Sequence, residues 1–186
     1  MEQKKEKKVE GKEIFKGRLL DLFVDDVELP NGHKSTREII RHCKASAILA
    51  FDQDGSLILE DQYRYPFDET ITEIPAGKCD KDEDPADCAK RELEEETGYK
   101  AMHLEYLGKI YPSVAYTDEI IYIYMATGLV KGERKLDDDE SLDYYKVSFE
   151  KFSDMIRKGV LVDAKTVAAY SFYVSKYKKF RKEIKL

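Results

Sequence analysis

A short helix that carries a cluster of carboxylates most constrains what this chain can fold into. Asp84 is a favoured N-cap residue, Pro85 is favoured at the first helical position, and Gly98 is a natural C-terminal stop. At about 100° per residue, one narrow stripe of this helix should face a core, and it consists of Ala86, Ala89, Leu93 and Thr97. The sequence therefore predicts a helix between Pro85 and Gly98 with one buried face.

Three glutamates, Glu92, Glu95 and Glu96, are expected on an exposed face beside that stripe, within about one turn of each other. The like charges of Glu92 and Glu96 oppose helix formation by about 0.2–0.5 kcal/mol, and Arg91 offsets part of this through Glu95. Oxygen ligands select hard divalent ions, Mg²⁺ above all, with Mn²⁺ as the second choice. The cluster by itself fits a metal site and a solvated acidic helix face equally well.

The N-terminal part of the chain has the signature of a β-hairpin. Residues 1–11 are charged and show no periodicity, so they are expected to form an irregular leader. β-forming residues on both sides of Asn31-Gly32 predict two antiparallel strands joined by a tight turn. We therefore assign residues 1–42 to a small β appendage and residues 43–186 to the main domain.

Strands and helices alternate in the main domain. The apolar run at residues 45–51 is interpreted as a strand, and residues 56–63 as its hairpin partner. The remaining expected elements are strands near 104–111 and 119–128 and helices near 149–158 and 163–182. This order predicts an α/β layered domain.

Composition and charge exclude several classes of protein. The formal net charge of −6 argues against binding nucleic acid by bulk electrostatics. Apolar runs such as Ala47–Phe51 are far shorter than the ~20 residues of a membrane span, and no apolar segment follows the charged N-terminus as in a secretory signal. The three cysteines fit neither a zinc pattern nor a disulfide framework. A cytoplasmic protein that acts on small molecules, without nucleic acid or membrane partners, is expected.

The spacing of residues around the helix resembles a known motif. Gly77, five residues, Glu83, seven residues and then the run from Arg91 to Tyr99 resemble the Nudix box at each specified position, with Tyr99 where an aliphatic residue is usual. The resemblance implies an enzyme that hydrolyses a nucleoside diphosphate linked to another group. It also implies an α/β/α sandwich with a mixed sheet, here with the N-terminal antiparallel β appendage.

Further matches resemble the ADP-ribose pyrophosphatase branch of the Nudix hydrolases. They are Gln62-Tyr63-Arg64, the segment from Glu73 to Gly77, Leu29-Pro30-Asn31-Gly32 before Arg37, and Asp163 to Thr166. The resemblance implies that Glu92, Glu95, Glu96 and the Ala76 carbonyl hold Mg²⁺ or Mn²⁺. It implies that Arg37, Arg64 and Glu73 contact the substrate. It also implies a homodimer in which residues 12–42 cross to the partner.

A departure from this branch occurs at Val114-Ala115, where a glycine is usual, and it leaves the substrate preference open. The expected reaction is Mg²⁺-dependent hydrolysis of ADP-ribose to AMP and ribose 5-phosphate. The alternatives are another nucleotide sugar such as GDP-mannose, a diadenosine polyphosphate, or a non-catalytic sensor of nucleotide sugars.

A catalytic carboxylate outside the box is expected in the acidic segment 135–141, because the box carboxylates are committed to metal. Glu140 is favoured, since its longer side chain reaches further, and Asp139 is second. Glu95 is the candidate within the box. A solvated acidic turn is the alternative interpretation of the segment.

Overall fold

The computed structural model of the 186-residue chain describes residues 4–136 and 141–177, which divide into two compact units. One unit comprises residues 1–43 with 111–120, and the other comprises residues 44–110 with 121–186. Within the described ranges, no helix combines the length and apolar character needed to cross a membrane. The two units are described separately below.

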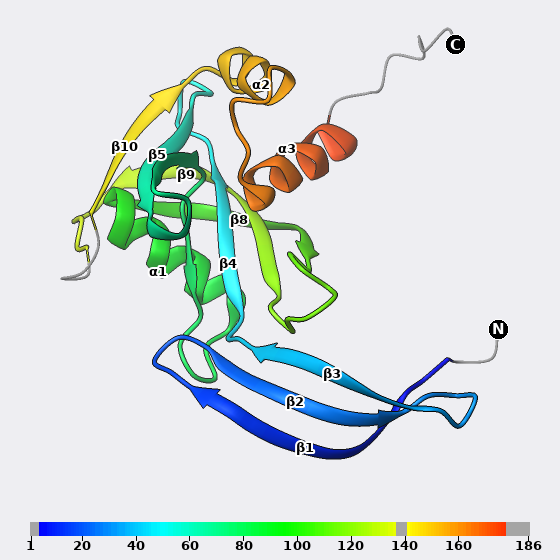
Figure 1. Ribbon diagram of the computed structural model, residues 1–186. Coiled ribbons are helices and arrows are strands. Elements are labelled where there is room, and N and C mark those ends of the chain that lie inside the picture. The colour runs from blue at the N-terminus through cyan, green and yellow to red at the C-terminus, as the bar shows by residue number, and fades with distance from the viewer. Residues whose placement is uncertain (1–3, 137–140, 178–186) are drawn as a thin grey trace, which may run out of the picture. The chain divides into compact units, whose positions relative to one another are not determined.

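The N-terminal unit is a three-stranded antiparallel sheet in the order β1-β2-β3 (Figure 1). Its strands are β1 (Lys7–Lys16), β2 (Asp21–Glu28) and β3 (Lys34–Arg41). The predicted hairpin is confirmed, and Gly32 adopts a φ of 83° in its turn, a conformation that glycine tolerates without strain. The expectation of an irregular leader is wrong from Lys7 onward. Every residue of β1 is exposed, so the strand carries no pattern of alternating burial that its sequence could reveal.

The second unit contains two sheets, and the expected mixed sheet is confirmed. One has the order β7-β4-β9-β8, with β4 and β9 parallel and the other pairs antiparallel; the other sheet is antiparallel, in the order β10-β5-β6. The strands are β4 (Ala45–Ala50), β5 (Leu57–Arg64), β6 (Glu69–Glu73), β7 (Ala76–Lys78), β8 (Tyr99–Ile110), β9 (Ile121–Lys131) and β10 (Leu142–Val147), with a 3₁₀ turn at Tyr65–Phe67.

The predicted hairpin between residues 45–51 and 56–63 is wrong. A single bridge, Phe51 to Leu57, connects the two segments, while β4 pairs with β7 and β9, and β5 pairs with β6 and β10. All six residues of β4 are buried, as expected for a central strand covered on both faces. Such a continuous apolar run identifies a buried strand but carries no information about its neighbours.

Helices cover both sides of β4 and form the expected α/β/α layers (Figure 1). The helices are α1 (Pro85–Thr97), α2 (Phe149–Arg157) and α3 (Ala164–Tyr177). Ile48 packs in one core with Leu93 of α1, whereas Leu49 packs in the other with Phe152 of α2 and Ala169 of α3. Alternate residues of one strand thus serve two cores, and the strand holds α1 in place from one side.

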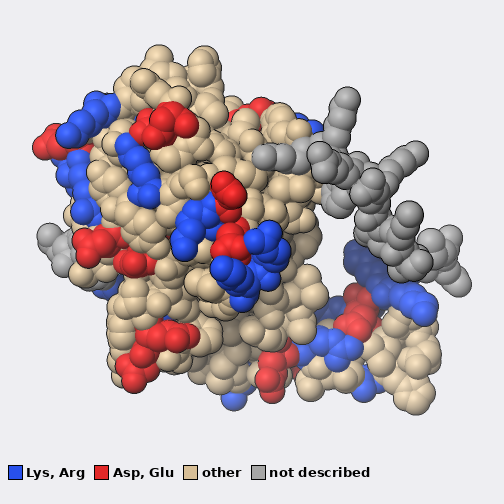
Figure 2. Space-filling model, turned by 90° about the horizontal axis from the view of Figure 1, so that it is seen from above, with Lys and Arg blue, Asp and Glu red and all other residues tan. Residues whose placement is uncertain are grey.

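Basic and acidic side chains lie interspersed on the face seen in Figure 2. Ion pairs between neighbours, such as Lys158 Nζ with Asp154 Oδ2 at 2.7 Å, neutralise part of the surface charge. This face lacks the continuous basic field that binds a nucleic acid backbone.

Candidate functional site

Local signals in the sequence set both ends of α1 as predicted. The Asp84 side chain accepts a hydrogen bond from Ala86 N at 2.8 Å, and Pro85 occupies the first turn, where its missing N–H costs nothing. Gly98 adopts a φ of 71° and donates its N–H to Glu94 O, which ends the helix. These caps fix where the helix begins and ends, and therefore on which face of it the glutamates lie.

The prediction of an exposed glutamate face is only partly right. Glu95 is partly exposed, but Glu92 and Glu96 are buried, with exposed fractions of 8% and 2%. The reason is that β7 lies against them. Ala76 N donates to Glu96 Oε2 at 3.0 Å, and a Cβ added to Gly77 would stand only 2.0–2.2 Å from the Glu92 carboxylate. Glycine at position 77 therefore allows the backbone to approach Glu92.

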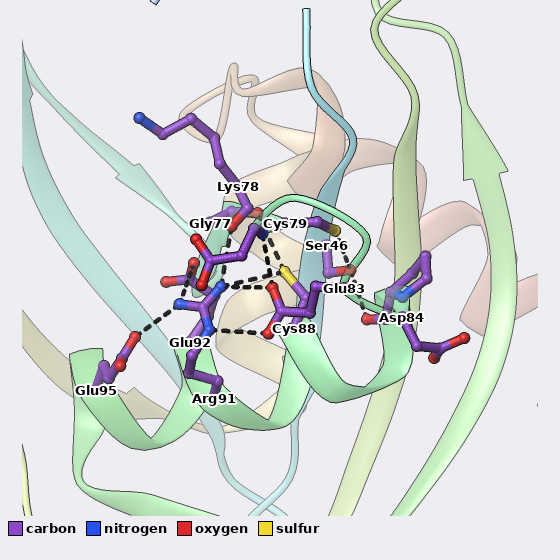
Figure 3. A network of polar contacts seen from close by, with 12 residues as sticks. Ser46, Gly77, Lys78, Cys79, Glu83, Asp84, Cys88, Arg91, Glu92 and Glu95 are labelled. Carbon is purple, nitrogen blue, oxygen red and sulfur yellow. Dashed lines mark hydrogen bonds and ion pairs between the residues drawn. The ribbon is translucent and has the colours of Figure 1, made fainter.

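Arg91 connects three of the box carboxylates (Figure 3). Its Nε and Nη2 bind Glu83 at 3.0 and 2.9 Å, and its Nη1 donates to Glu92 and to Glu95 at 2.9 and 2.8 Å. Glu83 is the main cause that raises the pKa of Arg91, and the same contact lowers the pKa of Glu83. The α1 acidic cluster is defined as Glu83, Arg91, Glu92, Glu95 and Glu96.

The composition of the α1 acidic cluster fits a hard divalent cation. The one guanidinium of the cluster contacts three of its four carboxylates, so an excess of negative charge lies on oxygen donors, the ligands that Mg²⁺ and Mn²⁺ prefer. The structure does not bring the predicted ligands to one point, because Glu92 and Glu95 turn to Arg91 while Glu96 accepts from Ala76 N. The predicted side-chain ligands are oxygen donors, and each is held by a partner within the protein.

A second group of charges surrounds Glu73, whose side chain is 1% exposed. Arg64 donates to Glu73 Oε1 through Nε at 2.7 Å and lies at 2.6 Å through Nη2, while Lys165 Nζ donates to Oε2. Lys165 also pairs with Asp163 at 3.2 Å. Burial tends to lower the pKa of Arg64, but the contacts with Glu73 outweigh it and raise that pKa. The Glu73 cluster is defined as Arg64, Glu73, Asp163 and Lys165.

Lys165 is the residue that sequence reasoning missed. It lies in the matched segment from Asp163 to Thr166, but its pairing with Glu73 spans 92 positions and depends on how α3 packs. Thr166 Oγ1 donates to Asp163 at 2.7 Å and accepts from Ile74 N at 3.0 Å. The start of α3 thus holds the backbone beside Glu73.

The segment from Glu73 to Gly77 connects the two clusters. Glu73 contributes its side chain to one, and the backbone of Ala76 binds Glu96 of the other. Pro75 O accepts from Ile48 N at 2.8 Å, which fixes the segment to the central strand β4. A shift of this segment would disturb both clusters together.

Arg37 lies on β3 in the N-terminal unit. It donates to Glu6 through Nε at 2.9 Å and through Nη2 at 2.5 Å, and Nη1 contacts Ser35 Oγ and Thr36 O. Within its own unit, Arg37 is therefore held by a carboxylate near the start of β1.

Glu140 and Asp139 lie outside the described residues. The chain on either side of them is anchored near the C-terminal end of α1. Lys135 N donates to Glu95 O at 3.0 Å, and Arg134 donates to Glu96 O and to Leu142 O, each at 2.6 Å.

Several known proteins are similar to this chain over most of its length. The NUDIX domain family matches residues 41–170. The chain is 44% identical over 169 residues to a methanol dehydrogenase activator from Bacillus methanolicus, covering 90% of this chain and 91% of that protein. It is 41% identical over 174 residues to an ADP-ribose pyrophosphatase from Bacillus subtilis (strain 168), covering 92% and 94%. A crystal structure of an ADP compounds hydrolase shares the fold, with a TM-score of 0.84 at 24% identity over 92% of this chain and 94% of that one.

Proposed function

The chain belongs to the NUDIX family, and we propose that it hydrolyses ADP-ribose at its pyrophosphate bond, giving AMP and ribose 5-phosphate. The observation that carries the proposal is the α1 acidic cluster, in which one guanidinium contacts three of the four carboxylates. The relative named ADP-ribose pyrophosphatase, aligned over almost the whole length of both chains, supports this substrate.

We propose that Glu92, Glu95, Glu96 and the Ala76 carbonyl hold Mg²⁺, with Mn²⁺ as the alternative. These residues would hold the cation, which would supply positive charge against the phosphates and a more acidic water. Arg91 orients Glu92 and Glu95, because its guanidinium donates to both carboxylates at once. The N–H of Ala76 orients Glu96 in the same way. Because these contacts already hold the carboxylates in place, little conformational entropy is lost when the substrate binds.

Arg64 is proposed to bind a phosphate of the substrate. Buried Glu73 fixes its guanidinium, yet 38% of the Arg64 side chain remains exposed. A guanidinium fixed in this way offers directed, charge-assisted hydrogen bonds to phosphate oxygens. Glu73 acts through Arg64 in this proposal, Lys165 holds Glu73, and Asp163 pairs with Lys165.

A carboxylate must also accept a proton from the attacking water, and Glu140 is proposed for this role, with Asp139 second and Glu95 third. The hydrogen bond from Lys135 N to Glu95 O, five positions before Glu140 in the chain, supports this proposal. Glu140→Gln should lower kcat with little change in KM, because a base acts in the transition state and scarcely in ground-state binding. Normal kcat in Glu140→Gln and in Asp139→Asn would leave Glu95 as the candidate.

A homodimer is also proposed, with residues 1–42 as the dimerisation region and Arg37 of one protomer contacting substrate in the other. In the described sheet, β1 pairs only with β2, and it exposes Val9, Ile14 and Phe15. An open apolar strand edge of this kind favours pairing with another chain. Sedimentation should show a dimer, and removal of residues 1–42 should abolish both the dimer and the activity. A fully active monomer would exclude this arrangement.

The substrate is tested by incubating the protein and Mg²⁺ with ADP-ribose, GDP-mannose and a diadenosine polyphosphate, and identifying the products by mass. The proposal expects the highest kcat/KM for ADP-ribose, with AMP and ribose 5-phosphate as products. A higher kcat/KM for either other compound would move the assignment to that substrate. Absence of turnover with all of them would favour a nucleotide-sugar sensor.

A second candidate function comes from the Bacillus methanolicus relative, which is named as an activator of methanol dehydrogenase. Its 44% identity over most of both chains makes the same role a candidate here. The assay is the rate of a methanol dehydrogenase with and without this protein. Activation that is lost in Glu96→Gln would place that role at the same site, and an unchanged rate would exclude it.

A further inference from the structure

A second kind of ligand cluster lies beside the α1 acidic cluster (Figure 3). The thiols of Cys79 and Cys88 and a carboxylate oxygen of Glu83 all lie within 4.8 Å of one another. In the described part of the chain, this is the one set of at least three Cys, His, Asp or Glu ligand atoms that meets this distance. Cys79 precedes α1, and Cys88 lies in its first turns, so the helix start brings the two sulfurs together.

The three groups are held by the fold. Cys88 is fully buried and Cys79 is 7% exposed. Cys88 Sγ lies 3.7 Å from Gly77 O, and Cys79 Sγ lies 3.9 Å from Ser46 Oγ. Glu83 accepts from Asp80 N at 2.8 Å, and its side chain is 17% exposed, which leaves one side of the cluster open to solvent. Burial raises the pKa of the Cys88 thiol.

We propose that Cys79, Cys88 and Glu83 form a binding site for one thiophilic divalent cation of the Zn²⁺ and Cd²⁺ class. Thiolate ligands select such ions over Mg²⁺, which prefers oxygen. Tetrahedral Zn²⁺ has Zn–S bonds of about 2.3 Å, which places two sulfur ligands about 3.8 Å apart. The present spacing needs to close by about 1 Å at most, and a fourth position stays open for water.

Charges and protons balance at this site. Two thiolates and one carboxylate carry three negative charges, and the divalent cation and the neighbouring Arg91 guanidinium carry three positive charges. Arg91 Nη2 lies 3.8 Å from Cys88 Sγ and 2.9 Å from Glu83 Oε2, so it is close enough to take part in this balance. Binding forms two metal–sulfur bonds and releases the two thiol protons to solvent.

The cation also affects Arg91. It shares the Glu83 carboxylate with the guanidinium and weakens the contact that holds Arg91 in place. Arg91 is then less firmly placed between Glu92 and Glu95. The site therefore couples a soft metal to the acidic cluster without using any of its proposed Mg²⁺ ligands.

The test is a titration of the reduced, metal-free full chain with Cd²⁺ in excess Mg²⁺, followed by the ultraviolet absorption of cadmium thiolate. One equivalent should produce the band. Partners one step removed from a metal change affinity by about 10–100-fold, so Cys79→Ser and Cys88→Ser should each weaken binding by at least about 100-fold. Cys43→Ser is the matched control, because Cys43 is exposed and lies outside the cluster, and it should bind like the wild type.

Two further measurements distinguish loss of the metal site from misfolding of a variant. Zn²⁺ should raise the Tm of the wild type and of Cys43→Ser, but not that of Cys79→Ser, because binding only to the folded state stabilises it. Glu83→Gln keeps both thiols, so it should retain the cadmium band and bind more weakly. A wild type without the band, or a band that survives in Cys79→Ser and disappears in Cys43→Ser, would overturn the proposal. Neither result decides whether ADP-ribose is the substrate, because both are measured without substrate.

Discussion

The two charge clusters of the second unit differ in their balance of charge. In the α1 acidic cluster, Arg91 is the one cation among four carboxylates and contacts three of them, whereas in the Glu73 cluster Arg64 and Lys165 pair with Glu73 and Asp163. The first cluster therefore retains negative charge that a divalent cation neutralises. The second is balanced, and its partly exposed Arg64 is fixed for an anion. A metal-dependent enzyme acting on a diphosphate needs both kinds of site, and the segment from Glu73 to Gly77 connects them.

The largest expected effect follows from removing charge in the α1 acidic cluster. Glu96→Gln keeps size and an acceptor for Ala76 N, but it loses a proposed metal ligand. Turnover of ADP-ribose should fall by at least ~100-fold, as for loss of a key transition-state stabiliser. Glu94→Gln is the matched control, since Glu94 lies on the same helix and pairs with Lys100. Equal losses in the two variants would contradict the metal assignment.

A substitution of Gly77 tests the position of the Glu92 carboxylate without altering any charge. Gly77→Ala would place a Cβ within 2.0–2.2 Å of Glu92, so the carboxylate has to move. A displacement of about 1 Å can cost up to about 100-fold, and we expect a loss of about 10- to 100-fold in kcat. Gly132→Ala is the control, because the nearest atoms to its Cβ would be side-chain atoms of Glu94 and Lys100 at 3.1–3.3 Å. Normal kinetics in Gly77→Ala would show that the position of Glu92 is unimportant.

The Glu73 cluster should respond differently. Lys165→Met removes one cation from buried Glu73, and loss of such a partner costs about 1–3 kcal/mol of stability. Because Arg64 is then less well fixed, KM for ADP-ribose should rise by about tenfold with a smaller change in kcat. Lys165→Arg should restore much of KM, whereas Lys176→Met, on the same helix but exposed, should change little. A fall in kcat at normal KM would contradict the substrate-binding role.

The smallest effect concerns pH and stability. The contact with Arg91 lowers the pKa of Glu83, so its contribution to stability is present above the ordinary glutamate pKa and is lost as pH falls through the lowered one. Glu83→Gln should lower Tm at neutral pH, and the difference from wild type should shrink on acidification. Glu133→Gln, at an exposed pair, is the control. A Tm difference that stays constant with pH would show that the ion pair adds no stability.

Local signals made α1 predictable, whereas contacts between residues far apart in the chain could not be predicted. Asp84, Pro85 and Gly98 mark the helix within a few residues, and the glutamate spacing follows from the helical repeat. The burial of Glu92 and Glu96 depends on β7, whose approach at Gly77 requires the tertiary fold.

The other errors have the same physical origin. The partners of β4 and β5 are set by sheet topology, and β1 pairs through its backbone while its side chains stay exposed. The contact of Lys165 with Glu73 joins elements far apart in the chain. The cysteines lack a zinc spacing in the sequence. The turn before α1 brings Cys79 and Cys88 near Glu83.

The most direct test is a calorimetric titration with Mn²⁺ of the wild type, Glu96→Gln and Lys165→Met. If the α1 acidic cluster holds the cation and the Glu73 cluster holds the substrate, Glu96→Gln should weaken Mn²⁺ binding by at least about tenfold. Lys165→Met should bind Mn²⁺ like the wild type. Normal Mn²⁺ affinity in Glu96→Gln, or a loss of affinity in Lys165→Met as large as that in Glu96→Gln, would contradict the division of roles between the two clusters.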